Sequence, residues 1–232
     1  MTKKPASSVT AGAADGVAQA REERGMERGT ERAERLRRAR AAGLERAEWR
    51  GRLAEERVAA RTVAVVNVLH GEGAGPAEVA AVLVEYGERP PVRLTDADVA
   101  ALRVAAGEVR DVLAAPDAGA AVARLNALLA RCAGPLRLTS HGGGSPWHPH
   151  IDSGDEAPWD EWFRATSALA LLSVVRERQG PPGAVCAARG CARVLIPYGA
   201  GPPRRFCSRR CATRERVAAH RARAAGNPSP SA

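Results

Sequence analysis

The densest chemistry in the chain is a set of four cysteines near its C-terminal end. Their spacing is C-x4-C, then fifteen intervening residues, then C-x3-C, at Cys186, Cys191, Cys207 and Cys211. Thiolates in two such pairs can complete a tetrahedral Zn²⁺ site when the intervening loop brings the pairs together. Two disulfides are the alternative, and a reducing cytosol disfavours them. We therefore expect a closed four-thiolate Zn²⁺ site, which leaves no open coordination position for hydrolysis.

Three histidines, His141, His148 and His150, fall in a segment with the pattern of a β-hairpin. A metal site is one interpretation, because alternate residues on a strand share a face and imidazoles are common ligands. Polar residues beside a glycine-rich turn need no metal, however, and only Asp152 adds an acidic group at matched spacing, so ordinary hairpin residues are favoured. The fifth cysteine, Cys132, is interpreted as a core residue rather than a nucleophile. With no clustered acid, base and nucleophile, the sequence does not favour an enzyme.

The net charge of +9 is unevenly distributed along the chain. Residues 1–61, 62–181 and 182–232 carry +5, −5 and +9, and the last segment has ten basic side chains against one acidic. Clustered arginine is the electrostatic footprint expected for a polyanion partner, although a solvated, solubilising surface is the plainer alternative. The arginines expected to contact nucleic-acid phosphates are Arg204, Arg205, Arg209, Arg210, Arg214, Arg216, Arg221 and Arg223.

Two functions fit these basic residues. In one, the zinc site orders a scaffold that binds DNA, and the protein is a transcriptional regulator. In the other, the finger is a zinc-stabilised protein-interaction module without direct DNA contact. A helix expected over residues 215–225 is basic over a broad arc, which suits backbone contact more than base reading. Arg214, at its start, has two candidate roles: contacting DNA or bracing the zinc knuckle.

Composition indicates which elements must position these groups. Hydrophobic residues make up 45% of the chain and aromatic residues only 3%, which favours helices built from Ala, Leu and Val. We expect a mainly α fold: a helical domain with a small β-hairpin, followed by a small four-cysteine zinc finger with a C-terminal helix. The expected segments are a disordered N-terminus (1–20), a charged helical extension (21–61), the helical domain (62–180), the finger (181–224) and a disordered tail (225–232).

Local signals divide the helical domain further. Helix-start signals are a proline at the first turn (Pro76) and N-caps at Thr95 or Asp96 and at Asp117. The expected helices span 76–86, 96–115, 117–131 and 159–178, with a hairpin within 135–151 and a Gly- and Pro-rich linker at 179–183. The body is expected to fold without the finger. Apolar residues at helical spacing include Val99, Leu102, Val104, Val109, Val112, Leu113, Val122, Leu125, Leu128, Leu129, Trp162, Phe163, Leu169, Leu172 and Val175.

The residues around the second cysteine pair carry a family resemblance. Phe206-Cys207-Ser208 follows a basic segment, and Cys211-Ala212-Thr213-Arg214 then opens a basic helix. This resembles the CGNR zinc-finger family, with Ala and Thr in place of the Gly and Asn of its tetrad. Upstream, Val65-Val66-Asn67-Val68-Leu69, Leu94-Thr95 with Leu102-Arg103, and Leu125-Asn126-Ala127-Leu128-Leu129 resemble the ABATE domain that usually precedes this finger. The resemblance implies a stress-induced transcriptional regulator whose finger binds DNA.

Location and further partners are weakly specified. No apolar stretch reaches the roughly 20 residues that cross a bilayer, and the first thirty residues lack the apolar core of a secretory signal. We therefore expect a cytoplasmic protein with no membrane partner. The acidic helical body is compatible with a homodimer and with a small-molecule or protein ligand. The sequence names no target DNA site and no direction of regulation.

Overall fold

The structure, a computed structural model, describes residues 55–71, 73–143, 147–198 and 202–225. The predicted disordered N-terminus (1–20) and the charged extension up to residue 54 lie outside the described residues. So does the predicted disordered tail (225–232) apart from its first residue, Ala225, which is instead the last residue of a helix. Over the described ranges the chain forms six helices and two two-stranded sheets. The predicted fold class is confirmed: a mainly α protein with a small hairpin and a four-cysteine cluster near the C-terminus.

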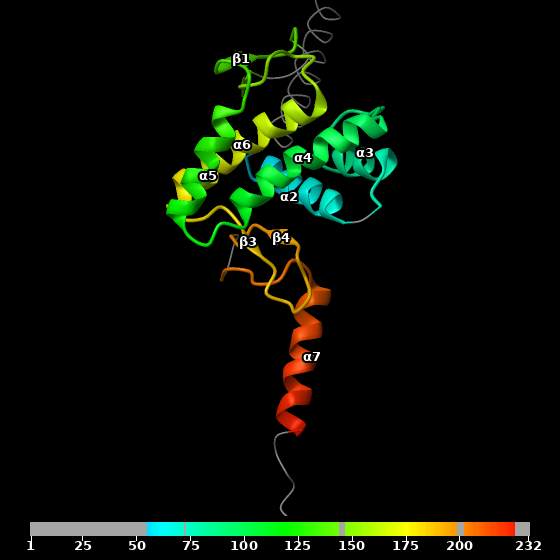
Figure 1. The fold of residues 1–232 in the computed structure, drawn as a ribbon, viewed down its shortest axis with the longest axis vertical. Coiled ribbons are helices and arrows are strands. Elements are labelled where there is room, and N and C mark those ends of the chain that lie inside the picture. Colours follow the sequence, from blue (N-terminus) through cyan, green and yellow to red (C-terminus); the bar gives the residue numbers. More distant parts are fainter. Residues whose placement is uncertain (1–54, 72, 144–146, 199–201, 226–232) are drawn as a thin grey trace, which may run out of the picture. The chain divides into compact units, whose positions relative to one another are not determined.

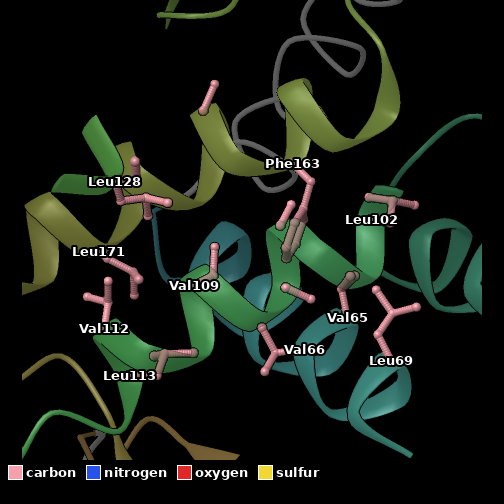
Figure 2. Packing of buried hydrophobic residues seen from close by; sticks show 14 of the residues in the cluster. Val65, Val66, Leu69, Leu102, Val109, Val112, Leu113, Leu128, Phe163 and Leu171 are labelled. Carbon is pink, nitrogen blue, oxygen red and sulfur yellow. The ribbon is translucent and has the colours of Figure 1, made fainter. Parts of the chain in front are cut away.

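Three helices build the core of the helical body: α2 (Glu55–His70), α4 (Asp96–Leu113) and α6 (Trp159–Arg178), which contact one another pairwise (Figure 1). Helix α3 (Pro76–Glu85) packs on α2 and α4, and α5 (Ala118–Ala130) packs on α4 and α6. Figure 2 shows the apolar side chains of α2, α4 and α6 directed toward one another. Fully buried members of this core include Val65, Leu69, Leu102, Val109, Val112, Leu113, Phe163 and Leu171.

The helices begin where local signals place them. Thr95 is the N-cap of α4, because its Oγ1 accepts from the Asp98 amide at 3.1 Å while the Asp98 carboxylate accepts from the Thr95 amide at 2.7 Å. This reciprocal pair is a capping box, which satisfies amides that no helical carbonyl reaches. Asp117 caps α5 through the Ala120 amide at 2.8 Å. Pro76 opens α3 at its first turn, where no amide is needed.

Helix α2 begins at Glu55, so it continues across the predicted boundary between the extension and the body at residue 62. Three of the apolar residues at helical spacing are exposed, Val104 at 62% and, to a smaller extent, Val122 and Leu172. Val104 lies two positions from the buried Leu102, about 200° around an α-helix, and therefore faces away from the core. The spacing of apolar residues predicts which face of a helix is buried. It does not predict how wide the buried face is around the helix axis.

The predicted hairpin consists of β1 (Arg137–Thr139) and β2 (His148–His150), paired antiparallel with Leu138 opposite Pro149. One face of the hairpin therefore carries Leu138 and Pro149, and the other carries the histidines of β2. On the first side Leu136, Leu138 and Trp147 are exposed. No helix within the described residues is long and apolar enough to cross a membrane.

The segment expected to be a linker is instead packed against the body. Pro182 and Gly183 are buried, and a Cβ on Gly183 would lie 2.6 Å from the backbone oxygen of Leu113. Glycine is required here because the two backbones approach so closely. The Tyr198 hydroxyl also donates to the Pro181 carbonyl at 2.9 Å. The Gly- and Pro-rich composition of residues 179–183 correctly indicated that the helix ends there, but it did not indicate that the segment is exposed to solvent.

Candidate metal centre

Two short strands and one helix position the four cysteines. Strands β3 (Ala184–Val185) and β4 (Val194–Leu195) form an antiparallel pair, and the Cys186 amide extends it by donating to the Arg193 carbonyl at 2.8 Å. The chain between them turns at Gly190, whose φ of +69° favours glycine, and presents Cys191. Cys207 precedes α7 (Arg209–Ala225), and Cys211 lies in its first turn.

The sulfur atoms gather as a metal ion would require. The Sγ–Sγ distances are 3.7 Å for Cys191–Cys207, 3.7 Å for Cys207–Cys211 and 3.9 Å for Cys191–Cys211. All four sulfurs, that of Cys186 included, lie within 4.8 Å of one another. A tetrahedral ion with Zn–S bonds of about 2.3 Å needs sulfurs about 3.8 Å apart. The four cysteines are therefore positioned to bind a metal ion.

The same distances exclude the disulfide alternative in this structure. A disulfide requires sulfurs about 2.05 Å apart, and all five cysteines of the chain are free. Cys132 takes no part in the cluster: it follows the end of α5, packs against the core of the body, and its thiol approaches the Leu128 carbonyl at 3.6 Å. Burial raises the pKa of Cys132, which makes a nucleophilic role unfavourable.

Backbone amides favour ionisation of one thiol of the cluster, that of Cys186. Burial opposes ionisation of Cys186, but the amides of Cys207 and Ala188 donate to its sulfur and hold its pKa at about 7. Burial and the neighbouring thiols raise the pKa of Cys207 to about 12. Cys186 is therefore partly ionised at neutral pH, whereas Cys207 needs a nearby cation to lose its proton.

A small apolar cluster and a set of polar contacts attach α7 to the cysteine loop. Ala188, Leu195 and Phe206 pack with the cysteines. The Arg214 guanidinium donates to the Arg189 carbonyl at 2.9 Å, and the Arg189 amide donates to the Glu215 carboxylate at 2.9 Å. The start of α7 is thus bonded to the backbone between Cys186 and Cys191, which supports the bracing role considered for Arg214.

The arginines predicted to contact nucleic acid fall into two groups. Arg204 donates to the Ile196 carbonyl at 3.0 Å, Arg205 lies 5.8 Å from the centre of the Phe206 ring, and Arg214 is occupied as described. The other five are exposed on α7, and among the described residues their side chains have no hydrogen-bond or ion-pair partner: Arg209, Arg210, Arg216, Arg221 and Arg223. We call these five the free arginines of α7.

Helix α7 begins earlier than predicted, at Arg209 instead of Glu215. The reason is Ser208, whose Oγ accepts from the Cys211 amide at 3.2 Å and whose carbonyl accepts from the Ala212 amide at 3.1 Å. Serine is a favoured N-cap, so this signal was present in the sequence. Because the helix starts earlier, Cys211 and the residues on either side of it lie on a regular helix.

One residue that joins the cysteine-bearing segment to the body was missed. The Asn67 side chain donates to the Val194 carbonyl at 2.9 Å and accepts from the Val194 amide at 2.9 Å, while the Val194 side chain is fully buried in the core of the body. Arg110 adds a bond to the Ala192 carbonyl at 2.9 Å. An asparagine inside an apolar helical run needs a polar partner, and this was the available signal.

With the cysteine geometry established, the chain can be compared with known families. Residues 184–224 match the model of the CGNR zinc finger. The match includes both cysteine pairs and every arginine predicted to contact nucleic acid. It does not reach the helical body, so the resemblance of residues 62–180 to the ABATE domain stays a prediction. No curated protein matches the chain.

Proposed function

We propose that residues 184–224 bind one Zn²⁺ through Cys186, Cys191, Cys207 and Cys211 and that helix α7 of this finger binds the phosphate backbone of DNA. On this proposal the protein acts as a transcriptional regulator, with the helical body as its sensing or dimerising part. Four thiolates fill a tetrahedral ion, so the metal has a structural role and no catalytic step is assigned to it.

Support for zinc comes from the donor set and the family match together. A tetrahedral set of four sulfurs suits zinc or iron, and the matched family is described as a zinc finger. Metal analysis of the purified protein tests the assignment. We expect one zinc to be lost in Cys207→Ser and retained in the matched control Cys132→Ser, because Cys132 lies outside the cluster. Loss of that zinc in the control would overturn the ligand set.

The observation that best supports DNA binding is the exposure of α7 and of its arginine side chains. Among its described side chains only Cys211 is buried, so packing contributes little to the helix beyond its first turn. The one acidic residue of the finger, Glu215, is already engaged by the Arg189 amide and lies 3.5 Å from its guanidinium. The free arginines of α7 therefore face solvent, and no acidic group among the described residues neutralises them. A polyanion would supply that negative charge.

Salt dependence of binding by the intact, zinc-loaded protein tests this function. Each phosphate contact contributes a slope of about −0.9 in log affinity against log salt concentration. Replacing both Arg216 and Arg223 by Ala should weaken binding to all duplex sequences alike and reduce the slope by about two. Arg93→Ala is the matched control, because Arg93 is exposed on the body and outside the finger.

Two results would count against the proposal. If the double variant changed sequence preference and left the salt slope intact, α7 would be reading bases and not phosphates. If the zinc-loaded protein showed no salt-dependent affinity for duplex DNA at low ionic strength, DNA binding would be wrong. The finger would then be the protein-interaction module considered from the sequence.

A further inference from the structure

A second group of metal-binding side chains lies on the hairpin, outside the finger. Antiparallel pairing places His148 and His150 on the same face of β2, and His141 lies in the turn after β1. The Nε2 atoms of His141 and His148 are 3.3 Å apart, and those of His148 and His150 are 2.9 Å apart. The three imidazoles offer ligand atoms that all lie within 4.8 Å of one another.

Carboxylates fix how two of these rings are protonated. His150 Nδ1 lies 2.8 and 2.9 Å from the two oxygens of Asp152, and His141 Nδ1 lies 3.3 Å from Asp155 Oδ2. An ionised carboxylate only accepts hydrogen bonds, so each Nδ1 carries a proton, and in the neutral form of the ring each Nε2 then presents a lone pair. A carboxylate behind the imidazole is the arrangement that orients histidine ligands in metal sites.

Counting protons shows that hydrogen bonds alone do not satisfy the cluster. His148 Nε2 can carry one proton, and it faces the lone pairs of both His141 and His150. A single proton on His148 Nε2 can make a good hydrogen bond to only one of these two nitrogens. At the other contact, two nitrogen lone pairs then face each other. A cation accepts all three lone pairs at once. Zn–N bonds of about 2.0–2.1 Å put tetrahedral nitrogens about 3.4 Å apart. The separation of His141 and His148 matches this value, and that of His148 and His150 is about 0.5 Å shorter.

The surrounding residues hold the cluster in this geometry. Asp152 is buried, with 1% of its side chain exposed, and Arg137 binds its Oδ1 at 2.7 Å. A Cβ on Gly134 would lie 1.9 Å from the Asp152 carbonyl oxygen, so only glycine lets the chain approach there. His141 has a φ of +48°, a conformation that costs energy for a residue with a side chain.

Charge also favours a cation at this place. Asp152 and Asp155 together outweigh Arg137, which lies 2.7 and 3.5 Å from them. With both carboxylates ionised and the histidines neutral, the three charged groups Asp152, Asp155 and Arg137 leave the site with one net negative charge.

We infer that His141, His148 and His150 form a second metal site, which binds a divalent transition-metal ion of the Zn²⁺ type. It shares no residue with the cysteine centre. Imidazole nitrogens suit zinc and its neighbours in the transition series. Three protein ligands leave a fourth position for water, and the exposed His141 places that position at the surface. The histidines interpreted from sequence as ordinary hairpin residues thus gain a specific role.

Zinc titration of the full-length protein, followed by metal analysis after gel filtration, tests the inference. The wild type should retain one equivalent of zinc more than His148→Ala. The Cys207→Ser variant should keep the histidine-bound equivalent and lose the cysteine-bound one, so that failure at one site is distinguishable from failure at the other. Matched controls are His70→Ala and His220→Ala, because both histidines are exposed and outside the cluster.

A positioning variant separates metal binding from mere folding of the hairpin. Asp152→Asn retains the volume of the side chain but removes the charge behind His150, and should weaken zinc at this site by about 10- to 100-fold. His141→Gln, at an exposed position, should abolish the second equivalent while leaving thermal unfolding of the zinc-free protein unchanged. The inference is overturned if wild type and His148→Ala retain equal zinc, or if both His141→Gln and Asp152→Asn bind it as the wild type does.

Discussion

At the scale of single residues, Arg214 shows that a basic side chain near the cysteines can stabilise the local fold through an internal hydrogen bond. Its guanidinium is bonded to the Arg189 carbonyl, in the loop that carries Cys191. The neighbouring Arg216 is exposed on the same helix and has no such partner among the described residues. Two arginines with the same charge and two positions apart therefore have different expected effects.

We predict that Arg214→Ala weakens zinc retention and that Arg216→Ala does not. The lost hydrogen bond involves a charged donor at an exposed site, so zinc affinity should fall by about fivefold. Competition against a chromophoric chelator measures this effect for both variants. Equal zinc affinity in the two variants would show that the Arg214 contact does not hold the cysteine loop. Weaker DNA binding by Arg216→Ala at full zinc occupancy would complete the separation.

At the scale of elements, what could be predicted from sequence depended on how local the signal was. The starts of α3, α4 and α5 follow from Pro76, Thr95 and Asp117, because caps act within one turn. The pairing of β3 with β4 was not predicted, since two-residue strands have no period to detect. Convergence of the histidines depends on the register of β1 and β2 and on a left-handed turn at His141. Composition alone specifies neither.

Helix α7 supports a prediction at the scale of elements. On our proposal its start belongs to the metal centre and its later turns bind DNA. Its first two turns carry Cys211 and Arg214, while its later turns carry Arg221 and Arg223. Ala219→Pro removes a helical hydrogen bond and costs about 3 kcal/mol in a helix interior. We expect the variant to retain zinc and lose most of its affinity for duplex DNA.

Anisotropy of a labelled duplex, with metal analysis of the same sample, measures both properties. Ala219→Gly is the graded control, since glycine costs about 1 kcal/mol and should weaken binding less. Loss of zinc in the proline variant would mean that the later turns of α7 stabilise the metal centre. Unchanged DNA affinity would mean that the helical form of these turns has no part in binding.

At the scale of the whole molecule, the cysteine-bearing segment and the helical body are in direct contact within the described residues. Val194 of β4 is a member of the core of the body, and its backbone amide and carbonyl are both hydrogen-bonded to the Asn67 side chain. The Gly183 junction leaves no space for a side chain against Leu113. That the body folds without the finger stays a prediction. If it does, the position of Val194 in the core is left empty and the Asn67 side chain loses its two hydrogen bonds to Val194.

The last prediction is that removing zinc destabilises the helical body. Zinc binding and folding of so small a centre are linked, so a chelator should release Val194 from the body as well as unfold the cysteine loop. Trp159 and Trp162 lie on α6 within the body, and their fluorescence reports its unfolding. Val194→Ala should itself cost roughly 2 kcal/mol, since it removes two buried methyl groups. In a protein of this size that lowers Tm by about 4–8 °C.

Val217→Ala is the matched control, because Val217 lies on α7 with 43% of its surface exposed. We expect it to leave Tm unchanged. The chelator should lower the Tm of the wild type, and should lower it less in the Val194→Ala and Asn67→Ala variants, where the link between loop and core is already weakened. A body transition that is insensitive to the chelator in the wild type would show that β4 stays in the core without zinc. The coupling argued from Val194 and Asn67 would then be wrong, and the finger would unfold as a separate unit.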